Sequence, residues 1–475
     1  MHDQQNTQAA ESAREWAVEQ LDSADFGDVR RQRRAALMLQ RAAERPAGKL
    51  TDVFRSGAEL QGAYDFIEGD VSAKAITSAF AEASVRAVGD ADWVYAVVDG
   101  TSLSLVDRTK TKGFGSIGKQ VLPTRGLKVI DVLAVAQDGT PVGLLDLEWW
   151  ARSPATSRSR HLRRRTGETE TTHWVDVVGR TGELLREHAP GCAPWFVIDR
   201  EGDCADILRA VAQPGQRFTV RATQNRSVVL PNGGRRPLFK HLNKQPVLGA
   251  HVVNVPAGPN RRARLAVLDV RIANVVLELP DHATGRRTEL PVRVVWARER
   301  RAPRGGTRLD WMLLTSEKVD NLTSAIAIVK GYCHRWRVED FHRTWKRGHC
   351  NVEDTQLHAM DRVIRWATML AAVAIRVERL KHLARTQPDA PATIELSTLE
   401  LEALREAKRQ IKSRVETIPD GVPSIAQAVR WIADLGGYTG KSSGGPPGST
   451  TIGRGLERLL IWTDAFACAR KLLNN

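Results

Sequence analysis

Cysteine is scarce and scattered in this sequence. Five cysteines occur among 475 residues, and no two of them are spaced as C-x-x-C. An odd, dispersed set argues against a disulfide framework, so we expect reduced thiols. His334, His342 and Cys350 lie near one another in the sequence, but their spacing matches no zinc pattern. The cysteines therefore predict neither disulfide bonds nor a zinc site.

Long apolar runs are also missing. No stretch of about 18 apolar residues could cross a bilayer, so we expect no membrane partner. The first residues, MHDQQNTQAAESAREWAVEQL, are polar and then amphipathic, without the basic-then-apolar layout of a secretory signal. We therefore expect a cytoplasmic protein.

Acidic residues are too few to balance the basic ones. Asp and Glu number 55 against 70 Lys and Arg, which leaves a net charge of +15. Such an excess favours a polyanionic partner, and nucleic acid is the first candidate. The preference for Arg over Lys is not itself evidence for a nucleic-acid partner, because a GC-rich genome produces the same bias. A chain of 475 residues also predicts two to four domains.

The first 80 residues carry helical patterns. The segment GDVRRQRRAALMLQRAAERP reads as an amphipathic helix that opens on an arginine cluster formed by Arg30, Arg31, Arg33 and Arg34. Short helices with such a cluster suit a small DNA-binding domain, although a solvated helix face is the alternative. We predict a helical DNA-end-binding domain over residues 1–80.

The pattern changes at Trp93. Three β-rich segments come first, and then a helix, the strand PWFVID, a second helix and the strand QRFTVRA. This is the order of a ribonuclease H-like core, so the predicted fold class is α/β. Residues 223–310 read as a β-rich insertion, and helices then continue to the end of the chain. We predict a catalytic domain over 81–385 and a helical C-terminal domain over 386–475.

Two basic loops stand out. One, ARSPATSRSRHLRRRTGETE, holds five arginines between Arg158 and Arg165, and the other is GPNRRARL in the insertion. Each could bind phosphates or simply be solvated, and neither indicates base recognition.

The segment YCHRWRVEDFHRTWK carries the sharpest signal. Tyr332 is followed by Arg335, Glu339 and Lys346 at offsets of 3, 7 and 14. On one helix these four residues fall within an arc of roughly 60°, whereas Phe341 faces away. A carboxylate flanked by phosphate-binding groups suits metal-dependent phosphoryl transfer on DNA. The alternative is that Arg335 and Glu339 form an ordinary i,i+4 pair.

Two further carboxylates end apolar strands. Asp99 follows VYAVV and Asp199 follows WFVI. Aspartate in such a place is often a turn former, but three converging acids could bind two divalent ions that clamp an in-line displacement. Mg²⁺ suits oxygen ligands of this kind. Other acids compete for the role, namely Glu201, Asp203, Asp340 and Glu353; of these, Asp340 lies about 100° around the helix from Glu339.

Several long motifs resemble one known family. The chain is similar nearly from end to end to the DDE transposases of bacterial insertion sequences, in the group that bears a Tyr-Arg-Glu-Lys motif. The matching segments are FGDVRR, GAYDFI, DGTSLSL, LLDLEWW, VIDREGD, HLNKQPVLGAHVVNVP, LDWMLLTSE and YCHRWRVEDFHRTWK. The Arg158–Arg165 loop is far more basic than its counterpart, and the last ninety residues align only loosely.

The resemblance implies a function and a site. It implies a bacterial, nucleoid-associated enzyme that binds terminal inverted repeats and target DNA, and that acts as a homodimer. Cleavage would free a 3′-hydroxyl, a DNA hairpin would form and reopen, and the ends would join the target. Asp99, Asp199 and Glu339 would be catalytic and hold two Mg²⁺, with Mn²⁺ as a substitute. The DNA contacts implied are Tyr332, Arg335, Lys346, Trp311, Trp336 and Arg221.

Trp311 has a particular role by resemblance. It would fill the gap left by a base flipped out near the cut end, because the lost base stacking must be compensated by stacking on a side chain. By its own pattern, LDWMLLTSE, it reads as a core residue of a strand. Two other functions remain open: a catalytically inactive regulator that binds transposon ends, and a general metal-dependent nuclease.

Overall fold

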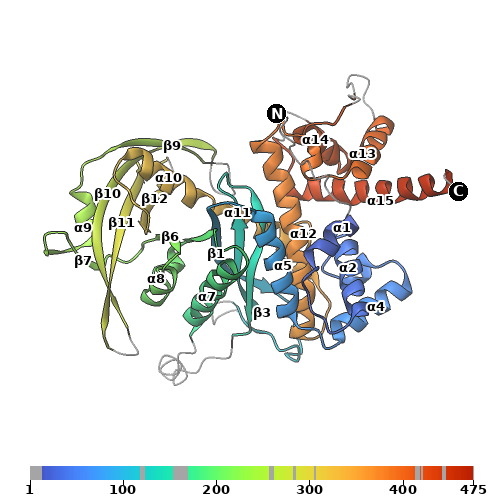
Figure 1. The fold of residues 1–475 in the computed structure, drawn as a ribbon, viewed down its shortest axis with the longest axis horizontal. Helices are drawn as coiled ribbons and strands as arrows, with labels where there is room; N and C mark the ends of the chain where they lie inside the picture. Colours follow the sequence, from blue (N-terminus) through green and yellow to red (C-terminus); the bar gives the residue numbers. More distant parts are fainter. Residues whose placement is uncertain are drawn as a thin grey trace.

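The computed structural model describes most of the chain. The described residues are 13–117, 124–152, 169–255, 262–281, 285–303, 306–411, 418, 421–440 and 445–473. The Arg158–Arg165 loop lies outside them, as does the first part of GPNRRARL. A large sheet occupies the middle and one end of the molecule, and the N-terminal and C-terminal helices lie together at the other end (Figure 1).

Five helices precede the first strand: α1 (Ala13–Gln20), α2 (Val29–Glu44), α3 (Leu50–Val53), α4 (Gly57–Glu68) and α5 (Ala73–Val88). The carboxylate of Asp28 caps α2 by accepting the backbone N–H groups of Arg30 and Arg31. Met38 and Leu39 of α2 are buried, as the amphipathic pattern predicts. Helix α5 continues through residue 80, where we placed a domain boundary, and packs against β4 (Pro141–Trp150) of the core sheet.

The core contains β1 (Trp93–Ser104), β2 (Gly115–Ser116), β3 (Arg125–Val135), β4 (Pro141–Trp150), β5 (Ala193–Ile198) and β6 (Arg217–Arg221). Helix α7 (Glu170–His188) precedes β5, and α8 (Ala205–Val211) precedes β6. Strand β1 is antiparallel to β3 and parallel to β5, and β5 is parallel to β6. Apart from the two-residue strand β2, the predicted order of three strands, helix, strand, helix and strand is confirmed.

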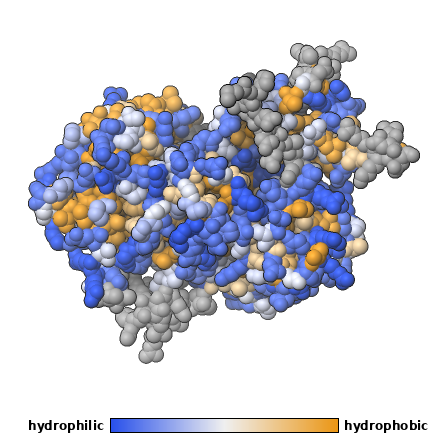
Figure 2. Space-filling view, in the orientation of Figure 1, coloured by the Kyte–Doolittle hydropathy of each residue, from blue (hydrophilic) through white to orange (hydrophobic). Residues whose placement is uncertain are grey.

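The insertion extends the core sheet. Its elements are β7 (Ser227–Val229), β8 (Arg235–Pro237), α9 (Leu238–Asn243), β9 (Gly249–Val255), β10 (Arg264–Pro280) and β11 (Arg287–Glu299). Strand β12 (Asp310–Thr315) pairs with both β11 and β6, so one sheet of 12 strands runs through the described residues. Figure 2 shows apolar side chains on the edge over β9 and β10, where Val252 and Leu265 are exposed.

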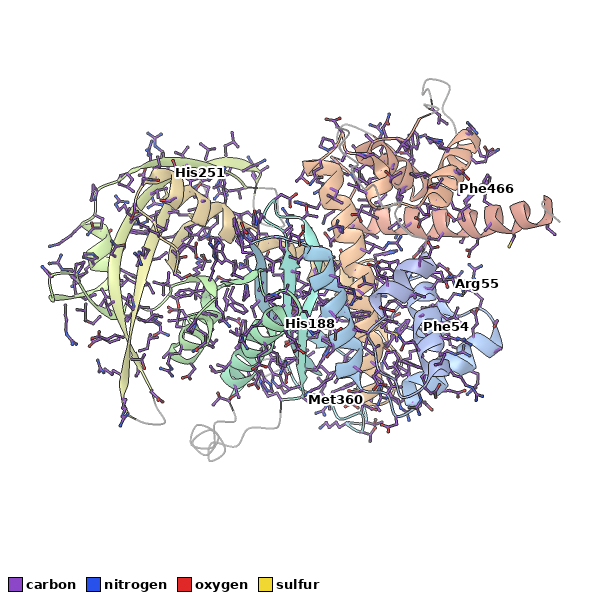
Figure 3. All side chains as sticks on the ribbon, viewed as in Figure 1. Phe54, Arg55, His188, His251, Met360 and Phe466 are labelled. Carbon is purple, nitrogen blue, oxygen red and sulfur yellow. The ribbon has the colours of Figure 1, made fainter. Side chains whose placement is uncertain are left out.

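Helices follow the sheet: α10 (Leu322–Cys333), α11 (Trp336–Lys346), α12 (Met360–Thr386), α13 (Thr398–Gln410), α14 (Ile425–Leu435) and α15 (Ser449–Leu473). Helix α12 contacts β4, α2, α5, α11, α14 and α15, so it joins the three parts of the chain. Figure 3 shows its first residue, Met360, at the base of the molecule, and Phe466 far along α15. Within the described residues, no helix is long and apolar enough to cross a membrane.

A buried polar network ties α11 to α12 and α15. Glu378 of α12 accepts hydrogen bonds from Thr344 of α11 and from Ser449, the first residue of α15. Lys381 pairs with Glu378 and lies 3.3 Å from the Asp340 carboxylate. Glu378, Lys381 and Thr344 are all buried. Because buried charges require partners, this network sets how the three helices dock.

Replacing Glu378 with alanine should therefore destabilise the fold by about 3 kcal/mol, since it leaves the Lys381 ammonium incompletely paired in the interior. Denaturant unfolding followed by circular dichroism measures this effect. Glu406→Ala is the control, because Glu406 makes an i,i+3 pair with the exposed Arg409. Equal losses of stability in the two variants would contradict the expectation.

Candidate active site

Adjacent strands bring Asp99 and Asp199 together. Val98 pairs with Ile198 in the parallel β1–β5 ladder, so the two aspartates follow neighbouring positions. Asp199 comes directly after β5, as predicted. Asp99 does not end its strand, which corrects the sequence interpretation: β1 continues to Ser104 because its second half stays paired with β3. The two carboxylates nevertheless lie at the same edge of the parallel strands.

The Tyr332–Lys346 segment is two helices rather than the single helix predicted. Helix α10 ends at Cys333 and α11 begins at Trp336. Between them the backbone hydrogen bonds span three residues, from the N–H of Arg335 to the carbonyl of Tyr332 for example, so the turn is tighter than an α-helix. Both linking residues keep helical angles, and the segment still presents its polar face to the strands. Phe341 is buried on the other side, as predicted.

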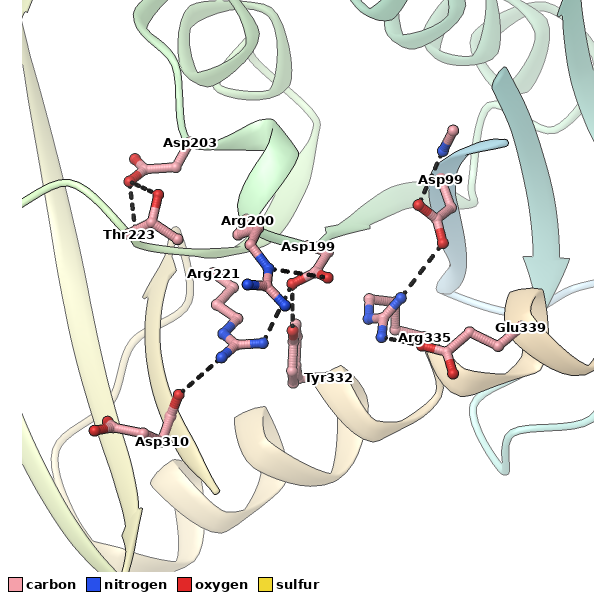
Figure 4. A network of polar contacts seen from close by, with 11 residues as sticks. Asp99, Asp199, Arg200, Asp203, Arg221, Thr223, Asp310, Tyr332, Arg335 and Glu339 are labelled. Atoms are coloured by element: carbon pink, nitrogen blue, oxygen red, sulfur yellow. Dashed lines mark hydrogen bonds and ion pairs between the residues drawn. The ribbon is translucent and has the colours of Figure 1, made fainter. Parts of the chain in front are cut away.

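Arg335 lies between the acids (Figure 4). Its guanidinium is 3.4 Å from the Asp99 carboxylate and 2.5 Å from that of Glu339. The Arg335 side chain is 9% exposed, whereas that of Glu339 is 51% exposed. Arg335 and Glu339, which could have formed an ordinary surface pair, are therefore joined through Arg335 to the half-buried carboxylate of Asp99.

Asp199 is held by groups from three elements. The phenol of Tyr332 donates to its carboxylate at 3.1 Å, and Arg221 of β6 lies 3.5 Å away. Arg200, directly after Asp199, is 3.9 Å away (Figure 4). Arg221 also donates to the carbonyl of Asp310 at the start of β12. Tyr332 and Arg221, which were predicted to contact DNA, thus both contact Asp199, a predicted metal ligand.

Lys346 points to the far half of β1. Its ammonium donates to the Thr101 hydroxyl at 3.2 Å and lies 3.8 Å from Glu353. Burial lowers the pKa of Lys346 below its usual value. The sequence pattern did not reveal Thr101 as a partner, because it comes from a distant segment.

Trp311 and Trp336 meet next to Tyr332. Trp311 lies on β12, is 4% exposed, and makes edge contacts with Tyr332 at 5.6 Å and Trp336 at 5.8 Å between ring centroids. Trp311 is thus a core residue of a strand, and it also contacts the residue that binds Asp199.

Three of the four competing acids have structural partners elsewhere, whereas Glu201 is exposed and its carboxylate lies beside Gly100. Asp203 is buried and accepts the backbone N–H groups of Thr223 and Gln224. Asp340 pairs with Lys381, as described for the buried network. Glu353 accepts the N–H of Ser104 at 2.8 Å and pairs with Arg347. These contacts favour Asp99, Asp199 and Glu339 as the site carboxylates.

A buried pair behind Asp99 escaped the sequence patterns. Asp131 of β3 pairs with Asp99 across the ladder, and its carboxylate is 2.5 Å from Nε2 of His342 on α11. The signal available was a lone aspartate in the apolar strand RGLKVIDVLAV. The sequence patterns gave His342 no role beyond a cluster with His334 and Cys350 that matches no zinc spacing.

The arginine cluster of α2 divides into two kinds. Arg31 donates to the carbonyls of Phe26 and Asp70, and the guanidinium of Arg34 covers Gly62 of α4 so closely that a Cβ there would clash. Arg30 and Arg33 are exposed. Arg31 and Arg34 therefore help hold the helices together, whereas Arg30 and Arg33 remain accessible to a partner.

Comparison with known families identifies the chain. A model described as Transposase DNA-binding matches residues 13–71, one described as Transposase DDE domain matches 167–376, and one described as Transposase Tn5 dimerisation domain matches 372–474. The chain therefore carries transposase DNA-binding, DDE and dimerisation domains. The DDE match includes Asp199 and Glu339, whereas Asp99 precedes it, so Asp99 joins the candidate set through its place beside Asp199. The core of the transposase is ribonuclease H-like.

DDE transposase domains use divalent metal ions, and the donor set of this transposase suits them. Asp99, Asp199 and Glu339 offer only carboxylate oxygens, the ligands that Mg²⁺ prefers. Across the described ranges, no three His, Cys, Asp or Glu side chains already converge on one point. The cation that now neutralises Asp99 and Glu339 is the guanidinium of Arg335. A divalent cation suits the same carboxylate oxygens that this guanidinium now pairs with.

The two strand carboxylates of the transposase differ in acidity. Burial raises the pKa of Asp99 to about 6, and the nearby Asp131 carboxylate adds to the rise against His342 and Arg335. Burial also acts to raise the pKa of Asp199, but Arg335 and Arg221 hold it below its usual value. Asp99 is therefore the carboxylate that protonates first on acidification.

Metal affinity should follow the ionisation of Asp99. A protonated carboxyl cannot hold a cation, so the Mg²⁺ concentration for half-maximal nicking should rise as pH falls through about 6, approaching tenfold per pH unit below it. The stability of the metal-free protein should change in the opposite direction with pH. Because the pKa of Asp99 is raised in the folded state, protonation of Asp99 stabilises the fold, and this stabilisation is lost as pH rises through about 6. Mg²⁺ titrations of nicking at several pH values test the first claim; a requirement that does not change between about pH 5 and 7 would refute it.

Proposed function

We propose that this protein is a cut-and-paste DNA transposase of the Tyr-Arg-Glu-Lys group. Its helical N-terminal domain, proposed as residues 1–80, binds terminal inverted repeats. The catalytic domain, 81–385, cuts and joins DNA, and the C-terminal domain, 386–475, dimerises so that each subunit cuts the end bound mainly by its partner. The observation that carries the proposal is the cluster of Asp99, Asp199 and Glu339 around Arg335.

Catalysis is proposed to depend on Asp99, Asp199 and Glu339 as the ligands of two Mg²⁺, with Mn²⁺ as a substitute. When bound, these ions supply Lewis-acid stabilisation for the charge that develops on the phosphoryl oxygens. Arg335 then exchanges its carboxylate partners for DNA phosphate; its Nε atom has no hydrogen-bond partner among the described residues. Tyr332 and Lys346 hold the strand, and Trp336 and Arg221 contact the DNA end.

The proposed reaction proceeds in steps that the chain's residues would organise. Water cleaves one strand and frees a 3′-hydroxyl, which attacks the phosphodiester of the opposite strand, closes a hairpin and releases the flanking DNA. A second water reopens the hairpin and restores the 3′-hydroxyl, which attacks a target phosphodiester and breaks the target strand as it joins. Trp311 supports the hairpin step by stacking in the gap left by an extruded base. Its contact with Tyr332 links that gap to the site.

The deciding experiment incubates purified protein with DNA that carries the element's own ends, with and without Mg²⁺, on a denaturing gel. Metal-dependent nicks and hairpins at the repeat boundary support the proposal. Binding without cutting in both Mg²⁺ and Mn²⁺ would instead indicate an inactive end-binding regulator. Cutting without strand joining in a plasmid target assay would indicate a general nuclease.

End binding should weaken steeply with salt. A protein with 6–10 phosphate contacts loses about 10³–10⁵ in affinity between 50 and 200 mM salt. Because Arg30 and Arg33 are the exposed members of the α2 cluster, replacing both with alanine should reduce the slope of log affinity against log salt by about two. Gel-shift titrations measure the slope, and a flat salt response of the unmodified protein would contradict the prediction.

A further inference from the structure

A second aspartate lies directly opposite Asp99 in the sheet. Asp131 of β3 pairs with Asp99 of β1 in the antiparallel ladder, and its side chain is 0% exposed. Residues directly opposite in such a ladder project from the same face, where like charges destabilise. A buried aspartate in this place therefore requires a compensating partner.

The partner comes from the helix that carries Glu339. His342 follows Glu339 by three residues on α11, about one helical turn, and its Nε2 lies 2.5 Å from Oδ2 of Asp131. The other oxygen, Oδ1, has no hydrogen-bond partner in the part of the chain that the structure describes. The imidazole is thus the group that anchors this carboxylate, and the pair joins β3 to α11.

Among the described residues, two other polar contacts join the segment Arg335–Lys346 to β1, and both involve residues with proposed functional roles. Arg335 contacts Asp99, and Lys346 contacts Thr101. In the proposed reaction Arg335 and Lys346 turn toward DNA phosphates, so both contacts would open. The Asp131–His342 pair includes no member of the proposed catalytic or DNA-binding set, so it can persist throughout.

We propose that Asp131 and His342 form a positioning pair that keeps Glu339 in place relative to Asp99 when Arg335 and Lys346 engage DNA. This inference rests on the proposed function. Because the pair acts on the arrangement of the carboxylates, its loss should weaken metal binding and leave the affinity for DNA ends unchanged.

The test measures Mn²⁺ binding to the full-length protein on end DNA by electron paramagnetic resonance. Asp131→Ala and His342→Ala should each weaken Mn²⁺ binding about tenfold, and the double variant should be no weaker than either. His342→Gln keeps a side-chain N–H donor and should restore most of the affinity. End binding by gel shift should stay within about twofold in all variants.

Asp340→Ala is the matched control, because it removes an ion pair of the same helix on the side that faces α12. It should lower the thermal midpoint without changing Mn²⁺ affinity. Unchanged Mn²⁺ binding in Asp131→Ala, or an equal weakening in Asp340→Ala, overturns the inference. If the alanine variants do not fold, the charge-free double variant Asp131→Asn, His342→Leu decides: weakened binding supports the pair, and wild-type binding refutes it.

Failure of the proposed function has a separate signature. Wild-type protein that binds Mn²⁺ but cuts no end DNA would refute transposition, and the comparison of Mn²⁺ affinities would still decide the role of Asp131 and His342. Wild-type protein that binds no Mn²⁺ would overturn both proposals.

Discussion

Glu339→Ala and Asp199→Ala should each reduce metal-dependent cleavage by about 1000-fold or more, which corresponds to about 4 kcal/mol of transition-state stabilisation. Each change removes oxygen ligands that Asp203 and Glu353 are not placed to replace, since both are committed to backbone N–H groups. Single-turnover cleavage of labelled end DNA measures the loss. Affinity for the ends should stay within about twofold of wild type.

A neighbouring acid supplies the control for this prediction. Asp340 directly follows Glu339 but pairs with Lys381 on the side of α12. Asp340→Ala should therefore cleave at a rate within a few-fold of wild type once differences in stability are corrected. Full-rate cutting in Glu339→Ala or Asp199→Ala would refute the assignment of the catalytic carboxylates.

Trp311→Ala should slow hairpin formation about tenfold more than it slows the first nick. A flipped-out base leaves a gap, and stacking of a base on an aromatic side chain is worth about 1–3 kcal/mol. The structure places Trp311 in edge contact with Tyr332, whose phenol binds Asp199. A prenicked substrate isolates hairpin formation, and an intact substrate of the same sequence gives the rate of the first nick.

The burial of Trp311 complicates its replacement. Truncating a buried aromatic ring to alanine costs about 3–5 kcal/mol of stability, which would lower both rates together. Trp311→Phe keeps an aromatic face and should recover most of the hairpin rate. Trp366→Phe, in a fully buried position of α12, controls for core damage. Equal slowing of nicking and hairpin formation in Trp311→Ala would count against base flipping.

Local patterns in the sequence were sufficient for the element types. Alternating and apolar runs predicted the core strands and the insertion, because side chains repeat every two residues in a strand and every 3.6 in a helix. The strand WFVI identified Asp199 as a residue at a sheet edge. The spacing of Tyr332, Arg335 and Glu339 placed them on one face, although the segment proved to be two helices.

Contacts between distant segments were beyond the reach of such patterns. Whether the insertion forms its own sheet or extends the core depends on β12 pairing with β6, and a sequence does not state which strands pair. Similarly, the exposed and the packed arginines of α2 look alike until α4 brings Gly62 against Arg34.

The sequence by itself placed Tyr332, Arg335, Glu339 and Lys346 on one face and set Asp99 and Asp199 beside apolar strands, because residue type and period carry that information. Only the tertiary structure decided their partners. The register of β1 against β3 sets Asp131 opposite Asp99, and the docking of α11 brings Arg335 between Asp99 and Glu339. Register and docking arise from the packing of the whole core, in which one residue of slip turns every side chain to the other face.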